Sequence, residues 1–241
     1  MDLDNVHIVL VETSHPGNIG AAARAMKTMG LSSLRLVRPK HFPSAEASAR
    51  AAGATDVLAA AQDCGSLDEA LADCGRVLGA SARMRSLPWP LVDAREGAAI
   101  AAEAAAITPV AVVFGRERSG LSNEELERCH QLVNIPANPE YSSLNLAASV
   151  QLMAYELRMA GDVPPLPSDE NSMPATGAEM EGMYRHLEQT MLKIGFMDPK
   201  APRLLMRRMR RLFNRAQLEQ MEVQMLRGLL GAAQGSKRPR S

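Results

Sequence analysis

The sequence predicts an α/β protein built on a mostly parallel sheet with helices on both faces, followed by a small all-helical extension. Short apolar runs rich in β-branched residues, such as 6–11 and 110–114, are typical of buried strands. These runs alternate with stretches of helical periodicity, which is the pattern of parallel strands joined by crossover helices. A proline-rich segment at 161–177 separates this part from three amphipathic stretches.

The individual elements follow from the spacing of apolar residues and from the residues that start and stop helices. The predicted strands are 6–11, 34–37, 76–80, 110–114 and 132–135. The predicted helices are 19–29 with Asn18 as N-cap, 44–52, 66–72, 93–106, 122–129 and one that begins at Leu144. Capping boxes are expected at the starts of two of these helices, from Ser66 with Glu69 and from Ser122 with Glu125.

The second half of the chain changes in composition, and this change sets the predicted domain boundaries. Three further helices are expected at 179–194, 202–214 and 217–230, each with apolar residues at helical spacing. The predicted organisation is therefore a sheet domain at 1–160, a linker at 161–178, a basic helical extension at 179–235 and a frayed tail at 236–241.

Composition excludes several classes of protein. The chain has 241 residues, 46% of them apolar, which is enough for a substantial core. No apolar run approaches the roughly 18 residues of a membrane span, and the N-terminus lacks the pattern of a signal peptide, so a cytoplasmic protein is expected. Three separated cysteines indicate reduced thiols, and five histidines show no ligand spacing, so no metal is expected.

Charge is distributed unevenly although the formal net charge is zero. Residues 193–241 hold 12 Lys and Arg against 3 Asp and Glu, whereas residues 1–192 hold 15 against 24. A basic end of this kind indicates a polyanionic partner, and nucleic acid is the usual one, although a solvated helix face would have the same composition. Aromatic residues make up only 3% of the chain, which disfavours a stacking platform for single strands.

Three polar loops follow predicted strands and are expected to meet at the edge where parallel strands end. Residues 17–24 combine glycines and alanines at a helix start, which favours anions, with Arg24 one to two turns into the helix. Residues 114–122 place Glu117 between two arginines, and the glycines there form neither a dinucleotide fingerprint nor a Walker sequence. Each loop alone also fits an ordinary βα turn with surface charges.

The third loop, residues 135–145, is broken by Pro136 and Pro139 before a polar turn and a long helix with one apolar face. Together, the three loops resemble the sequence motifs of the SPOUT class of RNA methyltransferases. Residues 10–15, 80–83, 87–90, 114–118 and 138–146 more closely resemble the TrmJ-type tRNA 2′-O-methyltransferases, which modify nucleotide 32 of the anticodon loop. The resemblance covers 6–160 strongly and extends to 186–189 and 210–213 in the helical extension.

The resemblance implies a trefoil knot at the end of the sheet domain, a homodimer, and S-adenosylmethionine as methyl donor. By position, the donor would contact Ala80, Ser81, Ala82, Gly115, Ile135, Ser142, Ser143 and Leu144. The residues implied for catalysis are Arg24, Asn18, Glu117, Ser143 and Asn145. The residues expected to bind tRNA are Arg24, Arg83, Arg116, Arg207, Arg208, Arg210 and Arg211, and removal of 161–241 should weaken tRNA binding far more than cofactor binding.

The resemblance marks Arg24 as catalytic, and its chemistry limits the role that it can have. A guanidinium keeps its proton up to about pH 12, so Arg24 is expected to hold a phosphate and stabilise a developing alkoxide instead of acting as a base. Ser143 and Asn145 are compatible with contacts to the cofactor, contacts to the ribose or a helix cap. Two other functions remain open from the sequence: methylation of rRNA or of another tRNA position, and RNA binding without chemistry.

Overall fold

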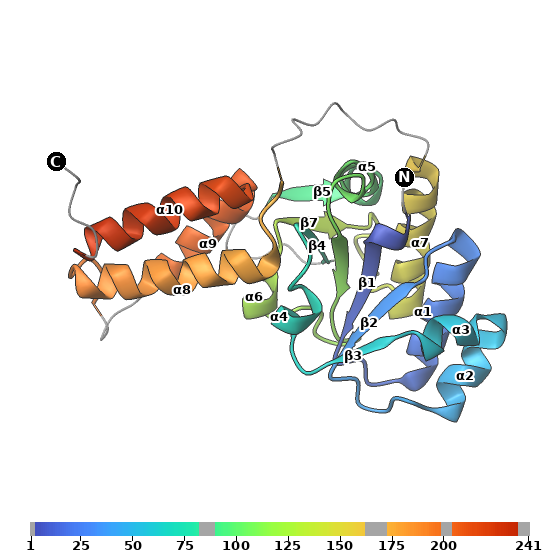
Figure 1. Cartoon of the computed structure of the whole chain (residues 1–241). Coiled ribbons are helices and arrows are strands. Elements are labelled where there is room, and N and C mark those ends of the chain that lie inside the picture. The colour runs from blue at the N-terminus through green and yellow to red at the C-terminus, as the bar shows by residue number, and fades with distance from the viewer. Residues whose placement is uncertain (1–2, 82–89, 162–172, 199–203, 236–241) are drawn as a thin grey trace.

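The computed structural model describes residues 3–81, 90–161, 173–198 and 204–235, and in them seven strands form one parallel sheet (Figure 1). The strand order is β3-β2-β1-β6-β4-β7-β5. The bounds are β1 Val6–Val11, β2 Ser33–Val37, β3 Gln62–Cys64, β4 Arg76–Ala80, β5 Leu91–Asp93, β6 Val110–Phe114 and β7 Gln131–Asn134. β1, β4 and β6 have the bounds that the sequence predicted, because each is a short, mostly apolar run near the centre of the sheet.

Alternate residues of the central strands point to opposite faces of the sheet and build two separate cores. Ile8 and Val112 are paired neighbours on β1 and β6, and both belong to the larger core. Val9 and Val113, one position further along each strand, belong to the smaller core. The predicted sheet with helices on both faces is therefore confirmed.

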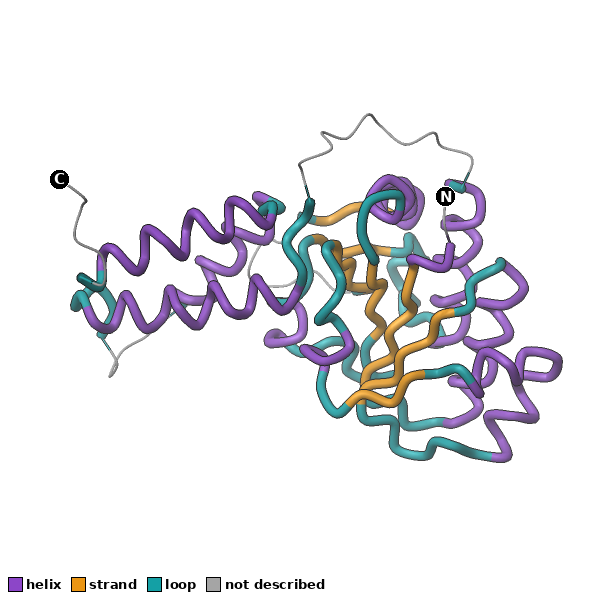
Figure 2. The backbone as a smooth tube through the Cα atoms, viewed as in Figure 1, coloured by secondary structure: helices purple, strands orange, loops and turns teal. Residues whose placement is uncertain are grey.

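Helices of unequal number cover the two faces (Figure 2). The larger core lies under α1 Pro16–Met29, α2 Ala45–Ala51, α3 Thr55–Ala59, α5 Ala94–Ala105 and α7 Leu146–Ala160. The smaller core lies under α4 Leu67–Ala70 and α6 Asn123–Leu126. Two short 3₁₀ helices, η1 Leu3–Asn5 and η2 Ala52–Ala54, complete this part of the chain.

The structure corrects the predicted starts of two helices. α1 begins at Pro16 and not at Ile19, since proline suits the first helical turn, and Asn18 therefore lies inside the helix and is not its N-cap. α7 begins at Leu146 and not at Leu144, because Asn145 holds the N-cap position. The sequence also missed the three-residue strands β3 and β5, which are too short for an apolar pattern.

Helix capping follows the prediction at α6 and in part at α4. Ser122 accepts a hydrogen bond from the backbone N–H of Glu125, and the Glu125 carboxylate accepts one from the N–H of Ser122, which completes a capping box. Ser66 caps α4 in the same way, but the carboxylate of Glu69 accepts from Gly65 and not from Ser66.

The helical extension consists of α8 Gly177–Lys193, α9 Leu205–Ala216 and α10 Gln220–Ala233, and it projects from one side of the sheet domain (Figure 1). Its own small core includes Met183, Tyr184 and Val223. Backbone contacts attach it to the sheet domain, since the N–H of Gly177 donates to the carbonyl of Cys74 at 2.9 Å. The side-chain amide of Asn214 donates to the carbonyl of Glu127 at 2.8 Å.

Two predictions concern segments only partly covered by the described residues. The expected linker at 161–178 includes 162–172, which lie outside them, and of the remainder Ala175 is buried and Thr176 caps α8. The chain between β4 and β5 contains residues 82–89, also outside, so the threading of the chain stays a prediction. Among the described residues, no helix combines the length and apolar character needed to cross a bilayer.

Candidate functional site

A cavity of about 210 Å³, the strand-end cavity, opens at the carboxyl ends of β4, β6 and β7, which are neighbours in the sheet. This edge is where open parallel sheets place their ligand sites, because the loops that follow adjacent strands meet there. The residues that line it are Ala80, Ser81, Phe114, Gly115, Arg116, Glu117, Arg118, Ser119, Gly120, Leu121, Val133, Ile135, Ser142, Ser143, Leu144, Leu146 and Ser149.

Seven of the eight residues predicted to contact a cofactor line this single cavity, although they come from three separate segments of the chain. They are Ala80, Ser81, Gly115, Ile135, Ser142, Ser143 and Leu144. The eighth, Ala82, lies outside the described residues. The walls combine apolar surface from Ile135 and Leu146 with serine hydroxyls, which suits a ligand that has both a flat apolar ring and polar groups.

The Gly115–Gly120 turn forms one wall of the strand-end cavity and leaves no room for a side chain at its start. A Cβ on Gly115 would lie 2.1 Å from the carbonyl carbon of Gly120 and 2.2 Å from the backbone nitrogen of Leu121. Reciprocal backbone hydrogen bonds between Arg116 and Gly120 close the turn. Gly120 has φ +68°, the left-handed region that favours glycine.

Glu117 joins this turn to the loop that follows β1. Its carboxylate accepts hydrogen bonds from the Ser14 hydroxyl at 2.9 Å, the Ser14 N–H at 3.1 Å, the His15 N–H at 3.1 Å and the Asn18 side-chain amide at 3.1 Å. Burial alone would raise the pKa of Glu117. Hydrogen bonds from its own backbone, from His15 and Ser14, and from Asn18 outweigh that effect and lower the pKa to about 2.

Replacing Glu117 with glutamine is expected to lower Tm at pH 7, with a difference from the wild type that shrinks as pH falls from about 4.5 toward 2. The ordinary pKa of 4.5 drops to about 2 in the folded protein, so ionised Glu117 stabilises the fold above 4.5 and loses that effect on acidification. Thermal unfolding of both proteins at pH 7, 4 and 2.5 measures this. Glu188→Gln, on the exposed side of α8, controls for the loss of one charge, and a pH-independent difference would contradict the prediction.

Asn145 completes a chain of contacts between three segments that are far apart in the sequence. Its side-chain amide donates to the Asn18 side-chain oxygen at 3.0 Å, and Asn18 in turn donates to Glu117. The side-chain oxygen of Asn145 accepts from the N–H groups of Ala147 and Ala148, at the first turn of α7. Of the roles that the sequence left open for Asn145, the geometry places it as the helix cap that also holds Asn18.

Arg24 lies apart from the strand-end cavity of its own chain. It is exposed on α1, about two helical turns from Asn18, and is not one of the residues that line the cavity. No hydrogen bond or ion pair of its guanidinium is found among the described residues. The fold therefore brings together Asn18, Glu117, Ser143 and Asn145, whereas Arg24 stays on the outer face of the same helix as Asn18.

The arginines predicted to bind RNA fall into two groups. Arg116 is held by Glu12 and Glu125, whose hydrogen bonds raise its pKa above the usual value. Arg207 pairs with Glu127, and Arg210 pairs with Glu181. The remaining members are the exposed Arg24 and Arg208, the half-buried Arg211, and Arg83, which lies outside the described residues.

One group of potential metal ligands occurs among the described residues, and its surroundings disfavour a cation. His7, Asp73 and Cys74 have ligand atoms within 4.8 Å of one another. The Arg35 guanidinium donates to both carboxylate oxygens of Asp73, at 2.6 and 2.8 Å. Since a positive charge already satisfies the only carboxylate of the group, we assign no metal to it.

Sequence reasoning missed several residues of the site. Ser14 contributes two of the hydrogen bonds to Glu117, and the signals for it are its place in the loop after the first strand and within the motif at residues 10–15. Leu146 and Ser149 line the strand-end cavity from the first turn of α7. They were overlooked because the helix was expected to begin at Leu144, which places these positions within the helix body.

Comparison with known proteins gives two family matches that follow one another along the chain. The model of the SpoU rRNA methylase family matches residues 5–155, and that of the tRNA methyltransferase TrmJ C-terminal domain matches residues 178–241. The chain is 51% identical to the tRNA (cytidine/uridine-2′-O-)-methyltransferase TrmJ of Cronobacter sakazakii, covering 98% of both chains. It is 52% identical to the tRNA (cytidine/uridine/adenosine-2′-O-)-methyltransferase TrmJ of Pseudomonas aeruginosa, covering 96% of this chain and 95% of that one.

Solved structures with similar folds agree with these matches. The crystal structure of TrmJ from Zymomonas mobilis (Z. mobilis ZM4) superposes with a TM-score of 0.82 at 35% identity, covering 94% of this chain and 97% of that one. An rRNA methyltransferase from Sinorhizobium meliloti with bound AdoMet superposes with a TM-score of 0.53 at 25% identity, covering 64% of this chain and 56% of that one.

Proposed function

The chain belongs to the SpoU methylase family and carries a TrmJ C-terminal domain, and from this premise we propose that it is a tRNA 2′-O-methyltransferase. The proposed reaction transfers a methyl group from S-adenosylmethionine to the ribose of nucleotide 32, a cytidine or uridine of the anticodon loop. The observation that carries the proposal is the convergence of three separate loops on the strand-end cavity, linked by Glu117, Asn18 and Asn145. The names of the relatives at about 50% identity support tRNA as the substrate.

The strand-end cavity fits the proposed methyl donor. Ile135, Leu144 and Leu146 offer an apolar surface for an adenine ring, and Ser81, Ser142 and Ser143 offer hydroxyls for polar groups. Gly115 and Gly120 keep one wall free of side chains. When bound there, S-adenosylmethionine supplies a methyl group on a positively charged sulfur, which an oxygen nucleophile can accept.

We assign the roles of the polar residues from their contacts. Glu117 and Asn145 position Asn18, and through it the start of α1, against the loops of the cavity. Arg24 is assigned to the phosphate beside the target ribose, where its fixed charge would stabilise the alkoxide as the 2′-hydroxyl loses its proton. The proton then passes to that phosphate or to water, since a guanidinium cannot accept it.

A homodimer is part of the proposal because Arg24 and the strand-end cavity lie apart within one chain. α7 presents an apolar face of Leu152, Tyr155 and Met159, which are 42%, 46% and 59% exposed. Exposed apolar residues at this spacing on a long helix are typical of a helix–helix interface. Two-fold pairing would let Arg24 of one protomer serve the cavity of the other.

The exposed arginines of α9 are proposed to contact tRNA phosphates. Arg208→Ala is expected to weaken tRNA binding at every ionic strength and to reduce the salt dependence of log Kd by about one ion, with no change in Tm. Arg207→Ala is the matched variant on the same helix. It is expected to lower Tm, because it leaves the buried carboxylate of Glu127 without its partner. Filter binding from 50 to 300 mM salt measures the effect on tRNA affinity, and thermal unfolding measures the effect on Tm. If Arg208→Ala and Arg207→Ala changed Tm and tRNA affinity equally, the two arginines would not have these different roles.

The decisive experiment is to map 2′-O-methylation in tRNA from cells that lack the protein, and to restore it with purified protein and S-adenosylmethionine. Loss and restoration at nucleotide 32 is the expected result. Restoration at another tRNA position, or in rRNA, would replace the proposed substrate. Calorimetry with S-adenosylmethionine, followed by methyl transfer to bulk tRNA, excludes a non-catalytic RNA-binding protein if Gly115→Ala removes the binding and the wild type methylates the RNA. We propose a cytoplasmic location, because the proposed substrate is tRNA.

A further inference from the structure

A second cavity of about 190 Å³, the junction cavity, lies between the sheet domain and the helical extension, away from the strand ends. Leu71 and Val77 line it from the sheet domain, and Met180 lines it from α8. Its volume is below the roughly 300 Å³ at which sites for larger organic ligands begin, so it suits one ring-sized group. None of its lining residues is used in the proposed chemistry.

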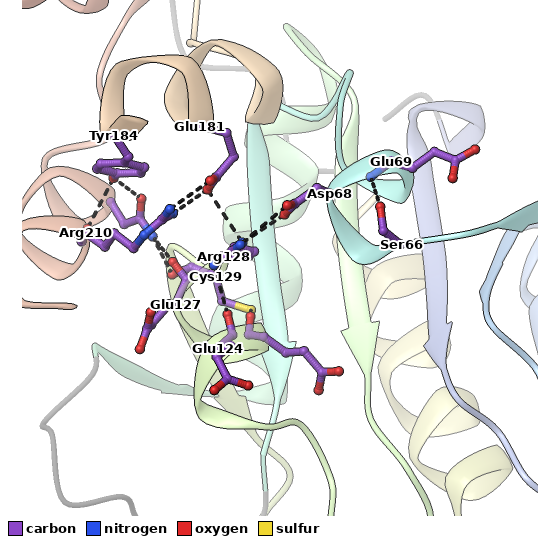
Figure 3. Close-up of polar contacts among 12 residues, drawn as sticks. Ser66, Asp68, Glu69, Glu124, Glu127, Arg128, Cys129, Glu181, Tyr184 and Arg210 are labelled. Atoms are coloured by element: carbon purple, nitrogen blue, oxygen red, sulfur yellow. Dashed lines mark hydrogen bonds and ion pairs between the residues drawn. The ribbon is translucent and has the colours of Figure 1, made fainter. Parts of the chain in front are cut away.

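Ion pairs hold the walls of the junction cavity in place, and one of them, between Arg128 and Glu181, crosses from the sheet domain to the helical extension (Figure 3). Arg128 donates to Asp68 at 2.8 Å and lies 3.6 Å from Glu181 of α8. Arg210 donates to Glu181 and lies 4.4 Å over the ring of Tyr184. The cavity is thus a built feature with fixed walls and not a gap between two loosely attached parts.

A buried histidine with one ring nitrogen unpartnered lines this cavity. His130 is 6% exposed, and its Nδ1 accepts a hydrogen bond from the N–H of Val77 at 3.0 Å. Burial, together with the nearby charge of Arg76, lowers the pKa of His130 to about 3, so the ring is neutral and its one proton must lie on Nε2. No acceptor for Nε2 is found in the described parts of the chain. An unpartnered donor on a buried ring favours a ligand that brings an acceptor atom.

The junction cavity is surrounded by one more arginine than its carboxylates pair with. Its carboxylates Asp68, Glu127 and Glu181 pair with Arg128, Arg207 and Arg210. Arg185 is exposed, also lines the cavity, and acts on Asp68 through space by lowering its pKa. No ion pair or hydrogen bond of its guanidinium occurs in the described part of the chain. The cavity therefore offers an apolar slot, one inner donor and one outer positive charge.

We propose that the junction cavity binds a single unstacked nucleotide of the RNA substrate, with a base oxygen on Nε2 of His130 and the adjoining phosphate on Arg185. Apolar contact with Leu71, Val77 and Met180 replaces the stacking on neighbouring bases that the nucleotide loses when its base turns out of the RNA strand. Splayed bases read in small pockets are a usual mode of RNA recognition by proteins. The inference rests on the proposed function for its RNA, and α9, which exposes Arg208, also lines the cavity with Asn214.

Mononucleotide binding tests the chemistry of the site independently of catalysis. With S-adenosylmethionine at saturation to occupy the strand-end cavity, cytidine 5′-monophosphate is titrated calorimetrically into the full-length protein. His130→Asn keeps an acceptor for the N–H of Val77, but its shorter side chain places no donor at the position of Nε2, and it is expected to weaken binding at least tenfold. Ribose 5-phosphate, which lacks the base, should bind equally to wild type and to His130→Asn, and more weakly to Arg185→Gln. Equal affinity of the nucleotide for wild type and His130→Asn would overturn the proposal.

Steady-state methylation then tests whether the nucleotide in the junction cavity belongs to the tRNA substrate. His130→Asn and Arg185→Gln are each expected to raise KM for tRNA at least fivefold, with kcat and the affinity for S-adenosylmethionine unchanged. Arg227→Gln on α10 is the matched control for charge and should leave KM unchanged. Unchanged KM in both variants, beside normal wild-type methylation, would overturn the RNA site while the proposed function stands. Cavity-dependent nucleotide binding without any tRNA methylation by the wild type would refute the proposed function instead.

Discussion

Replacing Arg24 with alanine is expected to lower kcat for tRNA methylation by about 10²–10³-fold, the usual cost of removing one donor that stabilises an oxyanion. The affinity for S-adenosylmethionine should not change, because Arg24 does not line the strand-end cavity of its own chain. The fold should not change either, since the side chain is exposed on α1. Single-turnover methylation, calorimetry and thermal unfolding measure these three properties separately.

Lysine at position 24 distinguishes two roles of the arginine. Arg24→Lys keeps the positive charge and loses the planar fork that can hold two oxygens at once. A loss nearly as large as that of Arg24→Ala is expected if the residue clamps a phosphate. Full activity of the lysine variant would contradict the clamp and leave only a general effect of charge.

Mixed dimers test whether Arg24 acts across the proposed two-fold axis. An Arg24→Ala chain has an intact cavity, and a Gly115→Ala chain has an intact Arg24. In a one-to-one co-expression, about half of the dimers are mixed and each contains one competent site, so about a quarter of wild-type activity is expected. Activity no higher than that of either parent would show that Arg24 serves its own chain.

Replacing Gly115 with alanine is expected to weaken S-adenosylmethionine binding by at least about 100-fold, which corresponds to roughly 2.7 kcal/mol. The added Cβ would lie 2.1 and 2.2 Å from backbone atoms of Gly120 and Leu121, and 2.5 Å from the carbonyl oxygen of Gly120. Backbone atoms cannot rotate away as a flexible side chain can, so the turn must move into or away from the strand-end cavity. Calorimetry measures the loss.

A second glycine provides the matched control for this substitution. A Cβ on Gly182 of α8 would meet its nearest atom, Nη1 of Arg227, at 3.9 Å, which is ordinary contact. Gly182→Ala is therefore expected to leave cofactor binding unchanged and to stabilise the helix by about 0.5–1 kcal/mol. Unaltered cofactor affinity in Gly115→Ala would mean that the turn tolerates the clash and is not part of the binding site.

The helical extension shows how tertiary contacts change the meaning of a sequence pattern. Six arginines between 203 and 215 indicated a surface for phosphates. The fold uses Arg207 to attach the extension to Glu127 of the sheet domain and Arg210 to join α9 to Glu181 of α8, which leaves Arg208 and Arg215 as exposed members of the set. The sequence could not separate the two groups, because the acidic partners lie 80 and 29 residues away along the chain.

Features that depend on neighbours along the chain could be predicted from the amino-acid sequence. Continuous apolar runs set the central strands, and the spacing of Ser122 and Glu125 set the start of α6. The residues around the strand-end cavity could also be predicted from the sequence, because they directly follow parallel strands whose carboxyl ends lie at one edge of the sheet. Such signals are local, and a short stretch of sequence contains all of the information that they need.

The hydrogen bonds between the loops could be found only from the three-dimensional structure. Glu117 forms hydrogen bonds with Ser14 and Asn18, which are about 100 residues away in the sequence, and Asn18 forms one with Asn145, which is 127 residues away. No local sequence pattern encodes these bonds. The contact between Asn145 and Asn18 joins the start of α7 to α1, and Arg24 of α1 is not among the residues that line the cavity. The physical reason is that a polar side chain takes its role from the partner it finds in space, and packing of the sheet and its helices selects that partner.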